Sequence, residues 1–289
     1  MISLIICSRN SDISQNLKQN IQNTIGLEYE LIVIDNSANR YSIFSAYNEG
    51  VRRAKYPYLC FMHDDILYHT QDWGKMVINH FKTENIGIIG VVGSHFMPST
   101  PASWPSTQVY SINILQRSSI NGITTTKHVT ELEHLDGVSA EVVALDGVWF
   151  CIAKDLFSII SFDDKTFKSF HFYDLDICFQ ARSAGYKVLV VSDILIEHFS
   201  GGCFNHVWFD NCIIFHNKWR KNLPQIAGVE LTNDEIRIKE ESVRDRFILS
   251  KEIYKLQAEI ISIRHSKAYR LGKFLLKPFS FIRYIISKK

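Results

Sequence analysis

The alternation of short apolar runs with helix-like stretches constrains the fold of this chain more than any other feature. Four runs rich in Ile, Val and Leu are typical of buried strands, at Ile2–Cys7, Glu30–Asp35, Pro57–Met62 and Ile86–Val92. Helical patterns lie between them, at Ser14–Thr24, Ser42–Ala54 and Asp72–Thr83. This order predicts crossover connections, and therefore an α/β fold with a mostly parallel sheet flanked by helices.

The alternation of strand-like and helix-like segments stops between Phe96 and Asp136. This stretch is rich in Ser and Thr and contains three prolines. We expect a long irregular loop there, and such loops are often functional. Afterwards the pattern resumes with two strands and two helices, predicted at Val148–Ala153, Lys154–Ile160, Asp174–Ala184 and Lys187–Ser192. Gly185 is well placed to cap the second of these helices.

The character of the chain changes near Gly228, which suggests a division into residues 1–228, a helical extension 229–263 and a tail 264–289. Thr232 and Glu235 have the spacing of a capping box. An apolar residue then recurs at a 4-3-4-3 spacing, at Leu249, Ile253, Leu256, Ile260 and Ile263. This short heptad stripe predicts packing either on the body of the protein or on a second copy, as a homodimer through 243–263.

The charge of the chain is distributed unevenly. The net charge is +2, yet no acidic residue follows Glu259, and residues 260–289 hold eight Lys or Arg among aromatic and aliphatic residues. The rest of the chain holds 24 bases against 30 acids. A basic, apolar terminus fits an anionic membrane surface, with packing on the body or an RNA-binding tail as alternatives. We expect peripheral membrane contact through 264–289 and no nucleic-acid partner.

The six cysteines are scattered and form no C-x-x-C pair, which is typical of reduced thiols in a cytosolic protein. The N-terminus lacks the basic region and cleavage site of a signal peptide, and no run of 18 uncharged apolar residues exists. We therefore expect a cytoplasmic protein, peripheral at the inner face of the cell membrane.

Polar residues follow the ends of the first three predicted strands. Ser8 and Arg9 could hold a phosphate or nucleotide, or form a polar turn. Asp35 could bind a base or ribose, or make an Asx turn. Asp64 and Asp65, next to His63, suit Mg²⁺ or Mn²⁺, since adjacent carboxylates repel each other without a cation; the alternative is a solvated loop. Ligand sites of open α/β sheets lie at the edge formed by the carboxyl ends of the strands, where all these residues are predicted.

A fourth site opens a later predicted helix with Tyr173, Asp174 and Asp176. The helix dipole favours carboxylates there, which explains one of the two without any chemistry. The other could serve as a general base, while its neighbour caps the helix or pairs with Arg182. His198 follows a further short strand and gains a role only if it lies near His63–Asp65.

Taken in order, these motifs resemble family 2 glycosyltransferases and their GT-A relatives, over roughly residues 1–206. The resemblance rests on the segments Ile2–Asn10, Leu31–Ser37, Ala46–Gly50, Phe61–Asp65, Leu145–Trp149, Tyr173–Tyr186 and Glu197–His198. It implies a GT-A fold and inverting transfer of a sugar from a nucleotide diphosphate to a hydroxyl of a glycan or lipid-linked acceptor. Such acceptors occur in the assembly of bacterial surface polysaccharides.

The resemblance also implies roles for individual residues. Asp174 would be the catalytic base, and Asp65 and His198 would bind Mn²⁺ or Mg²⁺. The nucleotide sugar would contact Ser8, Arg9, Asp35, Asn48 and Asp64. The donor and acceptor pocket would include His63, Asp146, Gly147, Trp149, Tyr173 and Asp176. Two residues depart from the family pattern: His63 replaces the first Asp of D-x-D, and Tyr173 replaces the Glu before the base.

The His63 substitution also motivates a rival interpretation, a non-catalytic sugar-nucleotide or glycan-binding protein that keeps the GT-A shell. A sugar nucleotidyltransferase is a second rival, but the segment after the first strand, residues 8–11, lacks the glycine-rich loop that this class needs.

Overall fold

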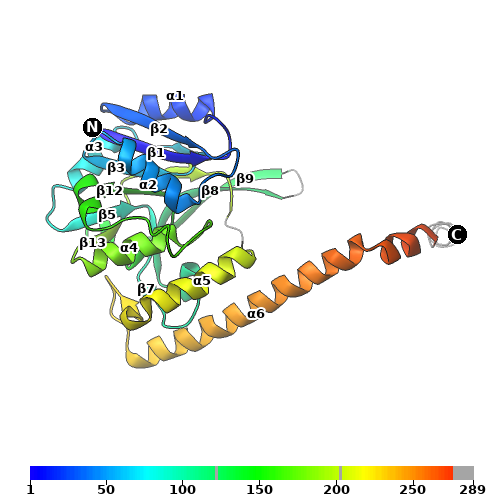
Figure 1. Cartoon of the computed structure of the whole chain (residues 1–289). Coiled ribbons are helices and arrows are strands. Elements are labelled where there is room, and N and C mark those ends of the chain that lie inside the picture. The colour runs from blue at the N-terminus through cyan, green and yellow to red at the C-terminus, as the bar shows by residue number, and fades with distance from the viewer. Residues whose placement is uncertain (121–122, 202–203, 276–289) are drawn as a thin grey trace. The chain divides into compact units, whose positions relative to one another are not determined.

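The computed structural model describes residues 1–120, 123–201 and 204–275. The chain forms two compact units, Met1–Arg244 and Asp245–Lys289. In the first unit, strands are flanked by helices, and one long hairpin extends from the body (Figure 1).

The central sheet of the first unit has seven strands. In spatial order they are β10 (Ser139–Glu141), β13 (Lys187–Val191), β5 (Ile86–Gly90), β12 (Trp149–Ala153), β3 (Tyr58–Met62), β1 (Ile2–Ser8) and β2 (Tyr29–Asp35). Only β10 and β12 run against the others. The mostly parallel sheet is thus confirmed, and the carboxyl ends of β1, β2 and β3 lie side by side.

Successive side chains of β1 point to opposite faces of the central sheet and pack against different helices. Ile2, Leu4 and Ile6 are buried in a cluster that also holds the apolar residues of α1 (Gln15–Thr24) and α3 (Trp73–His80). Ile5 points the other way, toward α2.

Close packing fixes α2 (Ile43–Arg53) on the sheet. A Cβ on its residue Gly50 would approach Ile5 Cγ2 to 2.3 Å, so only glycine allows the approach. Ring contacts then join Tyr47 of this helix to Tyr173 at the start of α4 (Tyr173–Ser183), with centroids 5.4 Å apart. The side chains of Ser14 and Ser42 cap α1 and α2, in agreement with the predicted helix starts.

A second sheet corrects the irregular loop expected between Phe96 and Asp136. Its strands follow the order β11 (Ala144–Leu145), β6 (Val92–Ser94), β8 (Tyr110–Ile120), β14 (Ile196–His198) and β4 (Ile66–Tyr68), with β9 (Ile123–Glu131) paired to β8. The segment therefore forms a long hairpin, preceded by β7 (Phe96–Met97), which pairs with β15 (Gln225–Ile226), and by the 3-10 helix η1 (Trp104–Thr107).

Several of the remaining elements match their predictions. A 3-10 helix, η2 (Lys154–Ser158), stands where a short helix was predicted, and Gly185 follows α4 with a positive φ of 87°. Next come α5 (His206–Trp219) and η3 (Arg220–Asn222), which were not predicted, and α6 (Asn233–His265). Thr232 and Glu235 exchange the hydrogen bonds of the predicted capping box.

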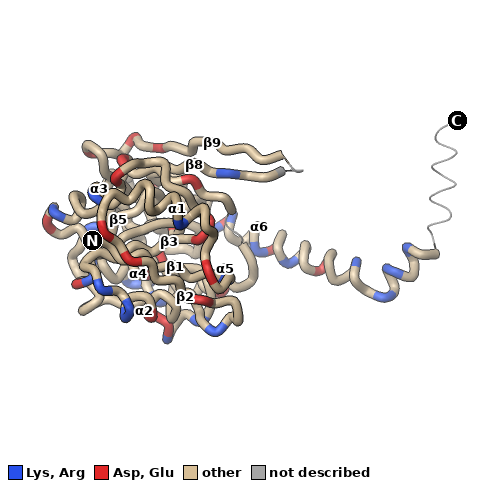
Figure 2. Tube along the Cα trace, turned by 90° about the horizontal axis from the view of Figure 1, so that it is seen from above, with Lys and Arg blue, Asp and Glu red and all other residues tan. Residues whose placement is uncertain are grey.

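The second unit begins within α6, and its described part continues as helix at 267–275. Lys and Arg recur along it (Figure 2). The predicted membrane tail lies partly outside the described residues, because 276–289 are not among them. No described helix is both long and apolar enough to cross a bilayer.

Candidate active site

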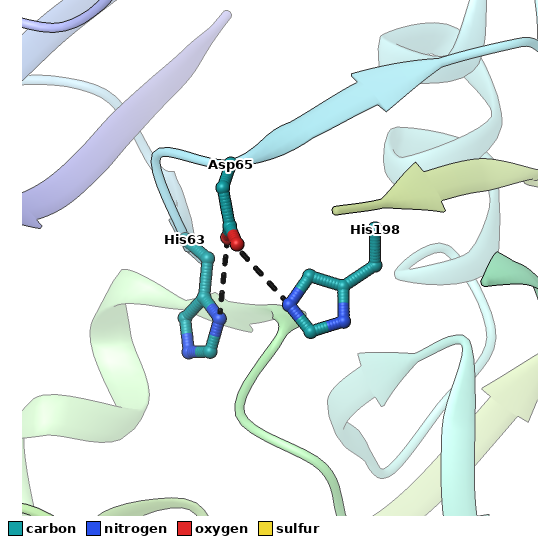
Figure 3. A group of neighbouring side chains, drawn as sticks. All are labelled: His63, Asp65 and His198. Carbon is teal, nitrogen blue, oxygen red and sulfur yellow. Dashed lines mark ion pairs between the residues drawn. The ribbon is translucent and has the colours of Figure 1, made fainter. Parts of the chain in front are cut away.

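Three side chains from two strand ends point toward one another. His63 and Asp65 follow β3, and His198 ends β14, which pairs with β4 so that His198 lies opposite Ile66. Asp65 Oδ1 lies 3.8 Å from His63 Nδ1 and 3.5 Å from His198 Nε2 (Figure 3). The pairing of β14 with β4 therefore joins residues 63–65 to a histidine more than a hundred positions away.

This trio has the geometry and chemistry of a divalent-metal site. One ligand atom from each of His63, Asp65 and His198 lies within 4.8 Å of the other two. Ligands at about 2.0–2.2 Å from a shared ion lie roughly 3–4 Å apart, which matches the two distances to Asp65. The side chains of His63 and Asp65 are 26% and 31% exposed, so a ligand can reach them.

The protonation states of the trio also suit cation binding. Burial lowers the pKa of His63, and the nearby His198 acts in the same direction, so the ring is neutral at neutral pH. Partial burial alone would raise the pKa of Asp65, but hydrogen bonds from His198 and Ser200 outweigh it and lower the pKa to about 2. The neutral imidazole of His63 and the carboxylate of Asp65 thus face the same point, where the ring of His198 also lies.

A buried glutamate holds the strand that carries His198. Glu197 is 5% exposed and accepts hydrogen bonds from Arg117 on β8 and Thr126 on β9. Arg117 also lies over the ring of Phe199, 4.1 Å from its centroid. The hairpin that replaces the expected loop therefore positions the candidate metal site.

The candidate base lies at the start of α4. Asp174 accepts hydrogen bonds from the backbone N–H groups of Gly147, at 2.8 Å, and Leu175, at 3.0 Å. Burial, and next the charge of Asp146, raise the pKa of Asp174 to about 7. A carboxyl group with that pKa is half ionised at neutral pH, which suits a general base.

Tyr173 links the base to the trio. Its hydroxyl lies 3.2 Å from His63 Nε2 and 3.2 Å from the carbonyl oxygen of Gly147. The backbone N–H of His63 donates to the carbonyl of Val148, so the two chain segments also run side by side. Asp174, His63 and their neighbours therefore occupy the same edge of the sheet, as the motif order predicted.

Residues predicted to bind the nucleotide gather beside this group. Ser8 pairs with Asp35 in the β1–β2 register, and its hydroxyl donates to Asp64. Hydrogen bonds from Ser37 lower the pKa of Asp35. Arg9 is exposed next to them. The structure thus brings Ser8, Asp35 and Asp64 together at the ends of β1, β2 and β3.

Two predicted pocket residues need correction. Trp149 is fully buried in the core, and its indole N–H donates to the hydroxyl of Tyr68, so it cannot line a pocket. Asp176 is 1% exposed and bonds Lys218 and Trp219 rather than Arg182. Its pairing with α5 makes it a structural residue.

Asn48 also departs from its predicted role in nucleotide binding. Its side chain exchanges hydrogen bonds with the backbone of Phe162. It lines a cavity of about 340 Å³ together with Gln180, Lys218 and the segment 161–165. The side chain therefore anchors this segment to α2, apart from the strand-end residues.

One candidate ligand was not predicted from the sequence. His63 was predicted as a pocket residue, and its substitution in D-x-D motivated the non-catalytic alternative, whereas in the structure His63 joins Asp65 and His198. The available signal was the position of His63, which takes the place of the first Asp of D-x-D two residues before Asp65.

The fold and this site together define a GT-A type protein with a candidate metal centre. Residues 3–223 match the family model described as "Glycosyltransferase like family", and the chain belongs to this family. No curated protein sequence matches the chain.

Several solved structures are similar in fold. GalNAc-T7 with UDP, GalNAc and Mn²⁺ is 11% identical, with a TM-score of 0.50, over 89% of this chain and 57% of that one. The mannosyltransferase PcManGT from Pyrobaculum calidifontis, in complex with GDP-Man and Mn²⁺, is 10% identical, with a TM-score of 0.47, over 94% and 83%. TarS 1–349 of S. aureus is 13% identical, with a TM-score of 0.44, over 68% and 60%.

Proposed function

We propose that the protein is an inverting, metal-dependent glycosyltransferase that moves a hexose from a nucleotide diphosphate to a hydroxyl acceptor. One observation carries the proposal. A carboxyl group with a pKa of about 7, Asp174, lies on the same sheet edge as the trio His63, Asp65 and His198, linked to it through Tyr173 and Gly147.

Asp174 supplies what a sugar hydroxyl lacks at neutral pH, a base that takes its proton during attack. The hydroxyl oxygen forms a bond to the anomeric carbon, and the bond from that carbon to the diphosphate oxygen breaks. The leaving nucleoside diphosphate keeps the electron pair, and the single displacement inverts the anomeric centre. The backbone N–H groups of Gly147 and Leu175 orient the carboxylate.

The remaining residues divide between the metal and the nucleotide. His63, Asp65 and His198 would hold Mn²⁺ or Mg²⁺, which neutralises charge on the leaving diphosphate when bound. Ser8, Asp35 and Asp64, with Arg9 beside them, would hold the nucleotide.

The acceptor we propose is a glycan or a lipid-linked glycan, of the kind used in bacterial surface-polysaccharide assembly. The basic tail 264–289 would bring the enzyme to the inner face of the membrane. The division into 1–228, 229–263 and 264–289 and the homodimer through 243–263 likewise remain proposals.

A thermal-shift screen of nucleotide sugars, with and without Mn²⁺, tests the donor and the metal together. We expect one donor to stabilise the protein, and only when Mn²⁺ is present. A transfer assay with that donor and a set of glycan acceptors then tests the chemistry. Donor binding without hydrolysis or transfer would instead identify a non-catalytic sugar-nucleotide-binding protein.

Flotation with liposomes of anionic lipid tests the tail. The full chain should float, and a chain ending at Arg264 should stay at the bottom of the gradient. The effect should weaken at high salt, because the attraction is electrostatic. Equal flotation of both chains would remove the tail as the anchor.

A further inference from the structure

The hydroxyl of Tyr173 stands between a candidate metal ligand and a backbone carbonyl. The residue is 3% exposed, and its hydroxyl lies 3.2 Å from both His63 Nε2 and the carbonyl oxygen of Gly147. Edge contacts with the rings of Tyr47 and Phe44, at centroid distances of 5.4 and 6.2 Å, hold the phenol in place.

The direction of these two hydrogen bonds follows from the number of protons available. A phenol has one proton to donate, and a carbonyl can only accept. Buried carbonyls are nearly always satisfied, so the Tyr173 hydroxyl donates to Gly147. It must then accept from His63, which places a proton on Nε2. A neutral imidazole protonated at Nε2 has its lone pair at Nδ1, the atom that faces Asp65 Oδ1 at 3.8 Å.

We propose that Tyr173 is a positioning residue that fixes His63 in the Nε2–H tautomer and so presents Nδ1 for metal binding. The metal part of this inference rests on the proposed function, whereas the tautomer does not. Second partners of ligating histidines commonly fix tautomer and ring orientation in this way. Tyr173 thus has a use at the position where the family pattern has a glutamate.

Gly147 makes the arrangement possible. A Cβ at this residue would lie 2.1 Å from the Tyr173 hydroxyl, so any other side chain would displace the phenol. The carbonyl of Gly147 accepts from Tyr173, while its N–H donates to Asp174. One glycine therefore orients both the candidate base and, through Tyr173, a candidate ligand.

NMR of the metal-free full chain with ¹⁵N-labelled histidine tests the tautomer directly. His63→Gln identifies the His63 signals by their loss. We expect the wild-type ring to show a protonated Nε2 and an unprotonated Nδ1, and Tyr173→Phe to give a mixture of tautomers. Tyr68→Phe, which removes another buried hydroxyl, should leave these signals unchanged. A wild-type ring protonated at Nδ1, or a Tyr173→Phe ring identical to the wild type, overturns the proposal.

Electron paramagnetic resonance titration with Mn²⁺ gives the second readout. Loss of an orienting partner should weaken Mn²⁺ binding about 10–100-fold in Tyr173→Phe. A wild-type chain that binds no Mn²⁺ would sink the metal-dependent function while leaving the NMR result intact. An unchanged affinity in Tyr173→Phe, with the wild type binding normally, would sink the positioning role alone.

A separate observation concerns α6 within the second unit. The five residues of the heptad stripe are large, apolar and 46–61% exposed, at Leu249, Ile253, Leu256, Ile260 and Ile263. Ile253 and Ile260 take the a positions, and Leu249, Leu256 and Ile263 take d positions, two of the three being leucine. β-branched residues at a with leucine at d favour two parallel strands.

The charged residues that flank the stripe also favour a parallel pair of helices. Glu252 and Glu259 take g positions, and Gln257 and Arg264 take e positions. In a parallel pair, Glu259 of one helix meets Arg264 of the other, whereas an antiparallel pair would bring glutamates together. We infer that this stripe, hereafter the α6 stripe, binds a second copy of the chain as a parallel two-stranded coiled coil.

Sedimentation of the full chain at about 50 µM, where mass action favours association, tests for the dimer. We expect the wild type to be dimeric and Ile253→Lys/Ile260→Lys to be monomeric. Ile248→Lys/Ile261→Lys is the matched control, since both residues are exposed but lie off the α6 stripe. A monomeric wild type, or a dimer that survives the lysines on the stripe, refutes the inference.

Oxidative cross-linking tests the orientation. In a parallel pair, a chain carrying Leu249→Cys should form a disulfide with an identical chain, above the background of the wild type. In an antiparallel pair an a position faces a d position, so Leu249→Cys should instead cross-link to a chain carrying Ile260→Cys. The second result would show that the copies associate in the opposite sense and would overturn the parallel arrangement.

Discussion

Asp174 and Asp176 lie two residues apart at the start of one helix, yet their surroundings differ in kind. Asp176 is buried against α5, where Lys218 and Trp219 donate to it. Asp174 faces the strand ends and accepts only backbone N–H groups in the described structure, with Asp146 as a like charge nearby. Burial raises the pKa of both carboxyl groups, but Lys218 opposes the rise at Asp176.

The difference separates a carboxylate that holds the fold together from one that is available for chemistry. A buried charge with a cationic partner stays ionised and fixes two helices. A buried carboxyl group without such a partner has a raised pKa. Near neutral pH it can therefore exchange a proton with a ligand.

Asp174→Asn should reduce transfer by about 10²–10⁴-fold, because it removes the proton acceptor. Donor binding, measured by thermal shift with Mn²⁺, should be largely retained, since Asp174 is not among the nucleotide residues. The comparison variant is Asp176→Asn, assayed at low temperature, which should keep most of the activity. Turnover at the wild-type rate in Asp174→Asn would remove this residue from the mechanism.

Removal of Lys218, the cation beside Asp176, should lower the stability of the protein rather than its activity. Lys218→Met leaves Asp176 buried without its charged partner, and we expect a loss of about 1–3 kcal/mol in the free energy of unfolding. Lys18→Met is a suitable control, because it breaks a surface ion pair with Asp12 that is worth little. Urea denaturation measures both variants, and equal losses would contradict the structural role of Asp176.

His63→Ala should weaken Mn²⁺ binding strongly, because it removes one of three ligands. His63→Asp should instead keep a metal site but shift its preference from Mn²⁺ toward Mg²⁺, since imidazole nitrogen suits transition ions and carboxylate oxygen suits Mg²⁺. Calorimetric titration with each ion measures the ratio of affinities. A ratio that is the same in His63→Asp and in the wild type would exclude His63 as a ligand.

The sequence was sufficient to predict the parallel strands and the edge of the sheet at which the candidate site lies. Ser8, Asp65 and Asp174 stand at strand or helix ends, and parallel strands bring such ends together whatever the details of packing. The β8–β9 hairpin escaped prediction because its strands are rich in Ser and Thr, and β9 is mostly exposed. β9 has no buried face, and in β8 the apolar alternation is confined to the buried Ile112 and Ile114, which is too short to predict an eleven-residue strand.

The errors at individual residues have a different cause. Trp149 and Phe150 are consecutive on β12 and point to opposite faces, where Trp149 meets Tyr68 and Phe150 meets Tyr47. A buried run looks the same from either face, so the sequence could not assign the direction. The partner of Asp176 lies on α5, and such a tertiary pairing leaves no local pattern.

The smallest expected effect concerns pH. If Asp174 is the base, transfer should rise with pH and level off above about 7, because only the ionised carboxylate accepts a proton. Asp146→Asn removes the negative charge that raises this pKa, so the profile should move toward lower pH. Asp72→Asn is the matched control, since Asp72 is an exposed acid whose positive φ of 57° asparagine tolerates well. A profile that moves equally in both variants would show that net charge, and not the neighbouring carboxylate, sets the ionisation of the base.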